Sequence, residues 1–358
     1  MELRLLDKSF TPVAVIDIFV SLIWTDRYYE CGDFELKIPA VQLPDTLAVD
    51  MYLSYDKSDH IMIIESVQLD RTVDEGDLIT VSGRSLEILL DRRVIKEYTY
   101  MKSSAQRGLE YYIRLLINQS IIAPSDEKRK IGNFIFEDSN NENIAKAQVE
   151  CECQGISLYD AVVALCQADG IGFRVYLSDK KFVFQLYQGE ERPFVVFSES
   201  MNNIASLQYL DSIADYKNAA FVMGEEGESG QKFCVYAEAD TPAEGLNRRE
   251  TAVDSTARHS STNEDGNIVT LTDAEYTKVL ENDGKTVLSS HNATQTANGE
   301  IDSIGSQFVY GENFKMGDIV SVDLGLTSPM LSRVVETTFS TDAKGFELYS
   351  SFETVTGS

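Results

Sequence analysis

Alternating apolar and polar positions predict a β-rich first third of the chain, over residues 1–97. Two of the apolar runs are joined through the acidic, Gly-containing segment Asp74–Asp77, a pattern typical of a hairpin. Ser85–Leu90 predicts a helical turn that closes this part. The expected strands are Asp33–Pro39, Met51–Tyr55, Ile61–Leu69 and Leu78–Gly83.

Residues 98–197 have a different pattern, which predicts a small α/β domain. One helix is expected from Ser103 or Ser104 to Ile121, and a second over Leu158–Ala168 with Ser157 as its N-cap. A hairpin is expected with strands Phe173–Leu177 and Phe182–Leu186 and a polar turn, Ser178–Lys181. Residues 125–150 predict an acidic loop with one short strand, Phe134–Phe136.

Residues 198–358 return to strands with an interruption at about 238–300. A polar loop is expected over residues 238–270. Thr272 and Glu275 then have capping-box spacing and predict a helix to about His291, which Gly284 would weaken. The expected strands are Ala219–Met223, Lys232–Ala237, Ser306–Tyr310, Ile319–Leu324, Leu331–Phe339 and Phe346–Phe352.

The two β-rich parts contain a short internal similarity. Ile64–Val67 followed by Asp74–Gly76 resembles Val335–Thr338 followed by Asp342–Gly345, with Glu65 matched to Glu336. The similarity favours two related β domains. The alternative is a chance likeness between two ordinary hairpins.

Charge and cysteine content narrow the class of protein. The 358 residues contain 31 Lys and Arg and 58 Asp and Glu, a net charge of −27, with a sequence pI of about 4.4. This balance argues against binding to nucleic acid or to an anionic membrane, since both attract Lys and Arg. We expect no signal peptide and no transmembrane segment. Five cysteines in a long chain do not indicate a disulfide framework, and they fit synthesis in a reducing cytosol.

No motif for catalysis, cofactor binding or metal binding is organised in the sequence. His60, His259 and His291 lie far apart, and Cys151 and Cys153 are too close for a zinc knuckle. Gly170 and Gly172 are expected to end a helix and not to form a dinucleotide loop, and residues 138–150 fit an EF-hand poorly. We therefore expect no catalytic, cofactor-binding or metal-binding residues and no enzymatic activity, which favours a structural or binding protein.

An ordered set of motifs resembles the siphophage tail proteins of the ReqiPepy type. They are Trp24–Leu36, Gly83–Arg93, Tyr216–Gly224, Arg249–Glu250 and Tyr310–Val320. In architecture this family is similar to the baseplate hubs, or tail-tip hubs, of contractile-tailed phages and related injection systems.

The resemblance implies two tube-like antiparallel β-barrel domains, residues 1–97 and 198–358, flanking the α/β domain, so that the fold is mainly β with an α+β insertion. It implies a homotrimeric ring in the virion tail of a phage or prophage, made in the bacterial host cytoplasm. The expected partners are the tail tube or distal tail protein, the tape-measure protein and a tail fibre or spike. DNA would pass through the lumen without specific binding during viral genome ejection, and we expect no stable membrane binding. From the net charge we expect a lumen lined mainly by Asp and Glu.

Two other classes of function remain as alternatives. A tail-associated cell-wall hydrolase would need a carboxylate pair, because the scattered histidines exclude the usual Cys/His and zinc motifs. A carbohydrate-binding or receptor-binding module would favour aromatic clusters in loops, whereas loops 125–150 and 238–270 contain few aromatic residues.

Overall fold

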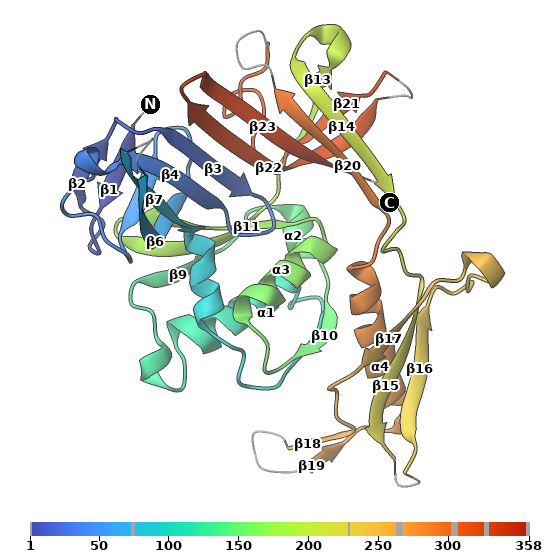
Figure 1. Ribbon diagram of the computed structural model, residues 1–358. Helices are drawn as coiled ribbons and strands as arrows, with labels where there is room; N and C mark the ends of the chain where they lie inside the picture. Colours follow the sequence, from blue (N-terminus) through green and yellow to red (C-terminus); the bar gives the residue numbers. More distant parts are fainter. Residues whose placement is uncertain are drawn as a thin grey trace.

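The computed structural model describes residues 2–72, 76–227, 230–262, 268–301, 307–325 and 329–355. Its main feature is a 13-stranded sheet that runs across the molecule (Figure 1). The strands of this sheet are β1 (Leu3–Leu6), β2 (Pro12–Ile16), β3 (Ser21–Arg27), β4 (Asp33–Pro39), β5 (Tyr52–Tyr55), β6 (Ile61–Thr72), β7 (Gly76–Ser85), β13 (Glu191–Ser198), β14 (Ile204–Ser212), β20 (Thr294–Ile301), β21 (Ile319–Asp323), β22 (Met330–Asp342) and β23 (Gly345–Thr354).

The two halves of this sheet have the same strand order. In the first half the order is β5-β6-β7-β4-β3, and in the second half it is β21-β22-β23-β20-β14. Each neighbouring pair in both series is antiparallel. The halves meet where β3 pairs with β22, and we call this junction the seam. The mainly β class is confirmed, but the described strands form open sheets and no closed barrel is found among them.

The two long hairpins are alike in detail. β6 has a bulge at Glu65, between the paired residues Ile64 and Ser66, and then continues as a regular strand to Thr72. β22 has a bulge at Val335 and continues to Asp342, through an equal number of paired residues. The bulges therefore make Val335 the counterpart of Glu65, and the match of Glu65 to Glu336 is wrong by one residue. Residues 73–75 of the first turn lie outside the described residues.

The α/β domain lies beside the first half of the sheet (Figure 1). Helices α1 (Leu109–Ile117) and α3 (Leu158–Ala168) pack with a sheet of β9 (Phe134–Glu137), β11 (Gly172–Ser178) and β12 (Lys181–Tyr187) around one apolar core. Ser157 caps α3 as expected, because its Oγ accepts a hydrogen bond from the Tyr159 N–H at 3.2 Å. The hairpin turn is shorter than expected. Only Asp179 and Lys180 form it, both with positive φ, which is typical of a two-residue turn.

Two expectations for the α/β domain are wrong. Helix α1 begins at Leu109 and not near Ser103, because Ser103 continues a strand pairing and its hydroxyl accepts a hydrogen bond from the Val149 N–H. The expected loop 125–150 also contains the helix α2 (Glu142–Lys146), capped by Asn141. The strand pairing that Ser103 continues is the antiparallel pair of β8 (Thr99–Lys102) and β10 (Glu150–Cys153). Short helical turns lie at Leu86–Arg92, Asn118–Ile122 and Glu127–Arg129.

A third unit is inserted into the second half of the chain. A three-stranded sheet of β15 (Ala219–Glu226), β16 (Lys232–Glu238) and β17 (Glu250–Asp254) packs against α4 (Asp273–Ser289), which has the expected capping box at Thr272. The expected loop 238–270 is partly wrong, since it includes β17, β18 (Ser260–Thr262) and β19 (Ile268–Thr270). Short turns at Ala40–Gln42, Glu199–Met201 and Gly245–Asn247 complete the list of elements.

Gly284 has a packing role that the sequence did not indicate. It is buried in α4, where an added Cβ would lie 2.4 Å from the Ala237 side chain and 2.7 Å from that of Val222. Glycine therefore lets the helix backbone approach the sheet of the third unit. It does not mark a weak point of the helix.

The remaining differences concern strands of the large sheet. The prediction of a strand over residues 306–310 is wrong for the described residues 307–310. Residues 307–309 do not form a strand, and Tyr310 forms only an isolated bridge with Phe314. Strands β14 and β20 were not expected. β13, which falls within the range expected for the α/β domain, pairs with β21 of the large sheet. None of the described helices is long and apolar enough to cross a lipid bilayer.

Candidate functional site

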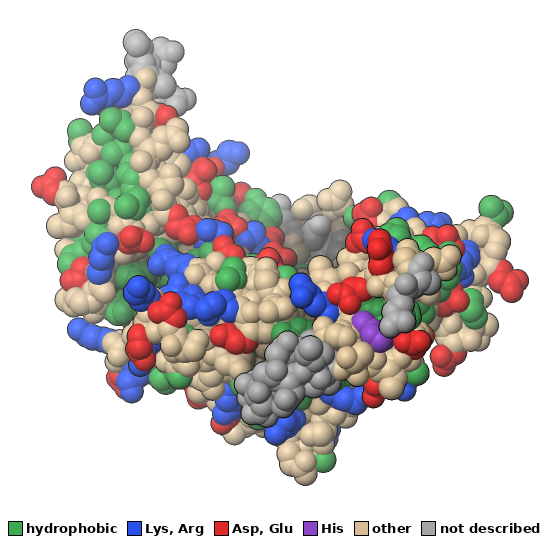
Figure 2. Space-filling view, turned by 90° about the horizontal axis from the view of Figure 1, so that it is seen from below, with side chains coloured by type: hydrophobic (Ala, Val, Ile, Leu, Met, Phe, Trp, Pro, Cys, Tyr) green, Lys and Arg blue, Asp and Glu red, His purple; other side chains and the backbone are tan. Residues whose placement is uncertain are grey.

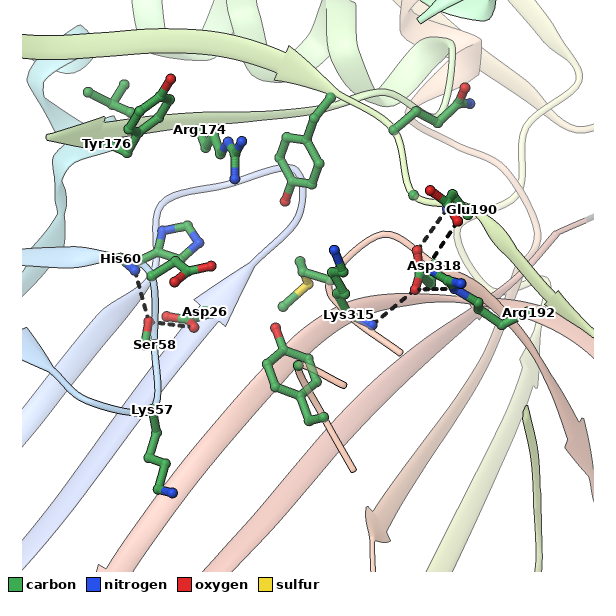
Figure 3. A pocket seen from close by; sticks show the side chains of 18 of the residues that line it. Asp26, Lys57, Ser58, His60, Arg174, Tyr176, Glu190, Arg192, Lys315 and Asp318 are labelled. Carbon is green, nitrogen blue, oxygen red and sulfur yellow. Dashed lines mark hydrogen bonds and ion pairs between the residues drawn. The ribbon is translucent and has the colours of Figure 1, made fainter. Parts of the chain in front are cut away.

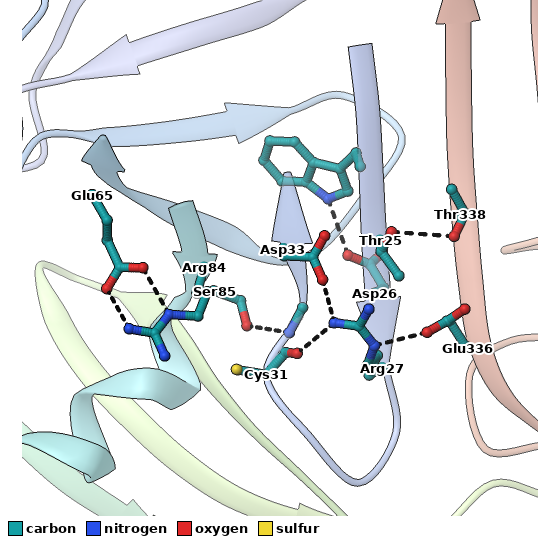
Figure 4. A network of polar contacts seen from close by, with 12 residues as sticks. Thr25, Asp26, Arg27, Cys31, Asp33, Glu65, Arg84, Ser85, Glu336 and Thr338 are labelled. Carbon is teal, nitrogen blue, oxygen red and sulfur yellow. Dashed lines mark hydrogen bonds and ion pairs between the residues drawn. The ribbon is translucent and has the colours of Figure 1, made fainter. Parts of the chain in front are cut away.

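The seam is the place where distant parts of the chain meet. Six residues of β3 pair with six of β22, from Arg27 opposite Glu336 to Leu22 opposite Thr341. The hydroxyl groups of Thr25 and Thr338 form a hydrogen bond across the seam (Figure 4), with their oxygens 3.2 Å apart. Paired backbone and matched side chains on both strands make the seam a continuous part of the sheet.

Arg27 links both sides of the seam through its guanidinium group. Its Nε donates to Glu336 Oε2 at 2.7 Å, and its Nη1 donates to the Cys31 carbonyl at 3.0 Å and to Asp33 (Figure 4). Glu65, by contrast, accepts two hydrogen bonds from Arg84 within its own hairpin. Two carboxylates thus hold Arg27 in place at the end of β3, where the two halves join.

The apolar side of the seam is closed by aromatic rings. Trp24 is fully buried and stands opposite Phe339, of which 3% is exposed. The Trp24 indole donates to Asp26 at 3.0 Å, and the Ser58 hydroxyl donates to the other oxygen of Asp26 at 2.7 Å. Burial raises the pKa of Asp26, although the charge of His60 opposes this effect. The seam therefore has a buried aromatic interior with one hydrogen-bonded acid near its end.

A polar pocket of about 460 Å³ opens beside Asp26. Its walls come from the loop 56–60, from β11, from residues 187–192 and from the loop 310–318 (Figure 3). His60 Nδ1 lies 3.4 Å from Oε1 of the buried Glu87. Burial by itself would lower the pKa of His60, but the charges of Asp26 and Glu87 outweigh burial and raise it to about 9. His60 is therefore a cation at neutral pH, and the carboxylate of Glu87 balances its charge inside the protein.

Asp318 organises the opposite wall of the pocket. Its carboxylate accepts from the backbone N–H of Glu190 at 2.7 Å, from Arg192 Nε at 3.1 Å and from the backbone N–H of Lys315 at 3.1 Å (Figure 3). These contacts attach β13 to the loop before β21. His60 pairs with Glu87 and Arg192 pairs with Asp318, and the Ser58 hydroxyl points to Asp26 and not to the His60 ring. This arrangement holds three segments together and does not activate a nucleophile.

The residues singled out for possible chemistry are not brought together. His259 lies in the third unit beside Asp273, at 3.2 Å, whereas His60 is in the pocket. Cys151 and Cys153 lie on β10, and burial raises the pKa of their thiols to about 12 and about 11. All five cysteines are free, and the described residues contain no group of three or more His, Cys, Asp or Glu that could hold a metal ion.

The sequence reasoning missed the buried acids Asp26 and Glu87. Both acids lie within the motifs that carry the family resemblance, and this position could have indicated them. Asp26 belongs to Trp24–Leu36, Glu87 belongs to Gly83–Arg93, and the pocket wall includes residues of Tyr310–Val320. Motifs far apart in the chain therefore converge on the seam and its pocket.

Comparison with known proteins agrees with these motifs. A family model described as Siphovirus ReqiPepy6 Gp37-like protein matches residues 2–352. The chain belongs to this family. The resemblance found in the sequence is thus confirmed over nearly the whole length of this Gp37-like protein, and the family is one of phage tail proteins. No curated protein sequence matches the chain.

Solved structures share the fold of this Gp37-like protein at low sequence identity. Prophage tail protein gp18 from Listeria monocytogenes EGD-e is 11% identical with a TM-score of 0.53, and the match covers 98% of this chain and 94% of that one. The 43 kDa tail protein of prophage MuSo2 from Shewanella oneidensis is 12% identical, with a TM-score of 0.53 and 98% coverage of both chains. A tail protein from Neisseria meningitidis MC58 is 11% identical, with a TM-score of 0.54 and coverage of 98% and 96%.

Proposed function

We propose that this Gp37-like protein is a structural hub subunit at the distal end of a phage or prophage tail. In this proposal three copies form a ring through which DNA passes during genome ejection, and the protein has no enzymatic role. The observation that carries the proposal is the repeated strand order of the two sheet halves, which are joined side by side at the seam.

The repeat matters because of symmetry. A chain with two equivalent β units contributes two similar positions to a ring, so three chains offer six. Such a ring can contact a six-fold tail tube on one side and a three-fold tip on the other. The seam supports this proposal, because it fixes two β units next to each other in one continuous sheet.

The sheet face opposite the apolar core is the proposed lumen wall. Cross-strand partners place the hydroxyl side chains of Thr25, Thr80, Ser82, Thr338 and Ser340 on this face. Trp24, Leu36, Val81 and Phe339 alternate with them and point to the core.

The cations of this proposed wall have carboxylate partners. Lys37 pairs with Glu35 at 3.1 Å, Arg27 pairs with Asp33 and Glu336, and Arg84 pairs with Glu65. Paired cations attract phosphates less than free ones, which supports passage of DNA without retention. Hydroxyl groups, ion pairs and the exposed Ile23 line this part of the wall, and with Glu347 opposite Ser340 its carboxylates outnumber its cations. A wall richer in Asp and Glu than in Lys and Arg, as the net charge led us to expect, therefore remains part of the proposal.

The charges elsewhere on the molecule are mixed. Figure 2 shows acidic and basic side chains intermingled over the underside, with apolar side chains between them. We propose that other surfaces contact the tail tube or distal tail protein, the tape-measure protein and a fibre or spike. The protein would be made in the bacterial cytoplasm and would function in the virion tail.

Two measurements test this proposal together. Light scattering at increasing protein concentration is expected to show a trimer, and antibody labelling of intact particles is expected to place the protein at the tail tip. A stable dimer or tetramer, or label along the whole tube, would contradict it. Release of cell-wall fragments by the purified protein would instead favour a hydrolase.

A further inference from the structure

The equivalence of the two sheet halves reveals two strand edges without a neighbour. β22 is shared: residues 330–333 pair with β21, and residues 336–341 pair with β3. Its counterpart β6 pairs with β5 only over residues 61–63. Among the described residues, 66–72 of β6 pair with β7 alone, and β14, the counterpart of β3, pairs with β20 alone.

The side chains along these two edges are more exposed than their counterparts at the seam. Leu69 is 47% exposed, whereas its counterpart Phe339 is 3% exposed. Tyr209 of β14 is 36% exposed, whereas its counterpart Trp24 is fully buried. Both edges therefore carry apolar groups on the core side of the sheet that lack the cover which the seam provides.

We propose that the free edge of β14 in one copy pairs antiparallel with residues 66–71 of β6 in a second copy, which repeats the seam between chains. This inference rests on the proposed ring and names the surfaces that would close it. β14 is the last strand at one end of the sheet path, and residues 66–72 of β6 lie in the other half, where β5 no longer pairs with this strand. One copy can thus bind one neighbour through each half of its sheet, which is the geometry of a head-to-tail ring.

The register follows from the pairing already present in the chain. Working outward from the bulges, Ser66 corresponds to Glu336 and Ser212 corresponds to Arg27, so Ser66 stands opposite Ser212. Leu69 then faces Tyr209, as Phe339 faces Trp24 at the seam. The same register places Gln68 opposite Leu210, the counterparts of Thr338 and Thr25.

A pair of cysteines tests this register. The hydroxyls of Thr25 and Thr338 are 3.2 Å apart, so cysteines at the corresponding positions of two copies should be close enough to join. Full-length protein carrying Gln68→Cys and Leu210→Cys is expected to form disulfide-linked dimers and trimers under mild oxidation. Replacement of the exposed Cys234 by Ser in every sample removes a competing thiol.

Two controls define what the crosslink means. Thr25→Cys with Thr338→Cys is expected to link within one chain, which validates the geometry of the seam. Gln68→Cys with Gln208→Cys lies on the same face but out of register, and it is expected to link much less. Equal linkage by the out-of-register pair would overturn the proposed register.

The outcomes separate this inference from the ring itself. A trimer by light scattering without a Gln68→Cys to Leu210→Cys link would overturn the edge pairing but leave the hub proposal standing. Linked chains that grow beyond trimers would support the pairing and overturn the closed ring. Protein that neither assembles nor links at any concentration would overturn both.

A second variant covers the possibility that the cysteine pair disturbs folding. Leu69→Lys places a charge on the proposed contact and is expected to weaken assembly at least ten-fold, with unchanged Trp24 fluorescence. Val41→Lys is the matched control, because Val41 is 90% exposed and lies outside both edges. Equal assembly of the two variants would overturn the proposal.

Discussion

Phe339 should be a main source of stability at the seam. Its side chain is buried against Tyr55 and Tyr310, with ring centroids 5.8 and 5.7 Å away, and it stands opposite Trp24. Phe339→Ala removes this packing and leaves a cavity, at a cost of about 3–5 kcal/mol in the free energy of unfolding.

Phe346 provides a matched control on the neighbouring strand. It is 37% exposed, so Phe346→Ala should cost only about 1–2 kcal/mol. The chain contains a single tryptophan, Trp24, so its fluorescence reports directly on the seam during urea denaturation. With a urea dependence of about 2 kcal/mol per molar, Phe339→Ala should lower the midpoint by about 1.5–2.5 M. Equal midpoint shifts for the two variants would show that the seam is not held by this ring.

Three further results are expected. Gly284→Ala should lower the melting temperature followed by circular dichroism, because the cost of overpacking, about 1–3 kcal/mol, exceeds the gain in helix propensity of about 1 kcal/mol. Thr286→Ala, on the exposed side of α4, should not lower it. A higher melting temperature for Gly284→Ala would refute the close packing. The pKa of His60 is raised to about 9, so its contribution to the free energy of unfolding, on the order of 3 kcal/mol, should be complete below pH 6.5 and lost as the pH rises through about 9. His60→Gln should remove this part of the pH dependence of the urea midpoint, and an unchanged pH profile would contradict the ion pair with Glu87. A double-mutant cycle of Arg27→Met and Glu336→Gln should give a coupling of about 1–2 kcal/mol in urea unfolding, and additive effects would mean that the pair does not stabilise the seam.

Local signals in the sequence predicted several elements well. Helix α3 has the expected bounds because Ser157 and the spacing of apolar residues act within a few positions of each other. The capping box at Thr272 and the two long hairpins were predicted for the same reason. Polar strands were harder to predict. β20 has no alternation of apolar and polar residues, and pairing with β14 and β23 on both sides defines it as a strand.

The seam and the pocket depend on contacts between distant segments. Nothing near Asp26 in the sequence indicates that Ser58 will bind it, and nothing near Glu87 indicates His60. The internal similarity suggested the two related hairpins but matched Glu65 to the wrong residue. A bulge shifts the pairing without leaving a distinctive residue type, so only the register of β6 and β22 could correct the match.

The seam also has a consequence for synthesis of the protein. Arg27 and its partner Glu336 are separated by 309 positions. At about 5–20 residues per second, the ribosome needs about 15–60 s to reach β22 after β3 has been made. During this time the edge of β3 has no partner in its own nascent chain. The N-terminal half therefore completes its sheet only after nearly the whole protein has been translated, and until then its open edge can pair with other newly made chains.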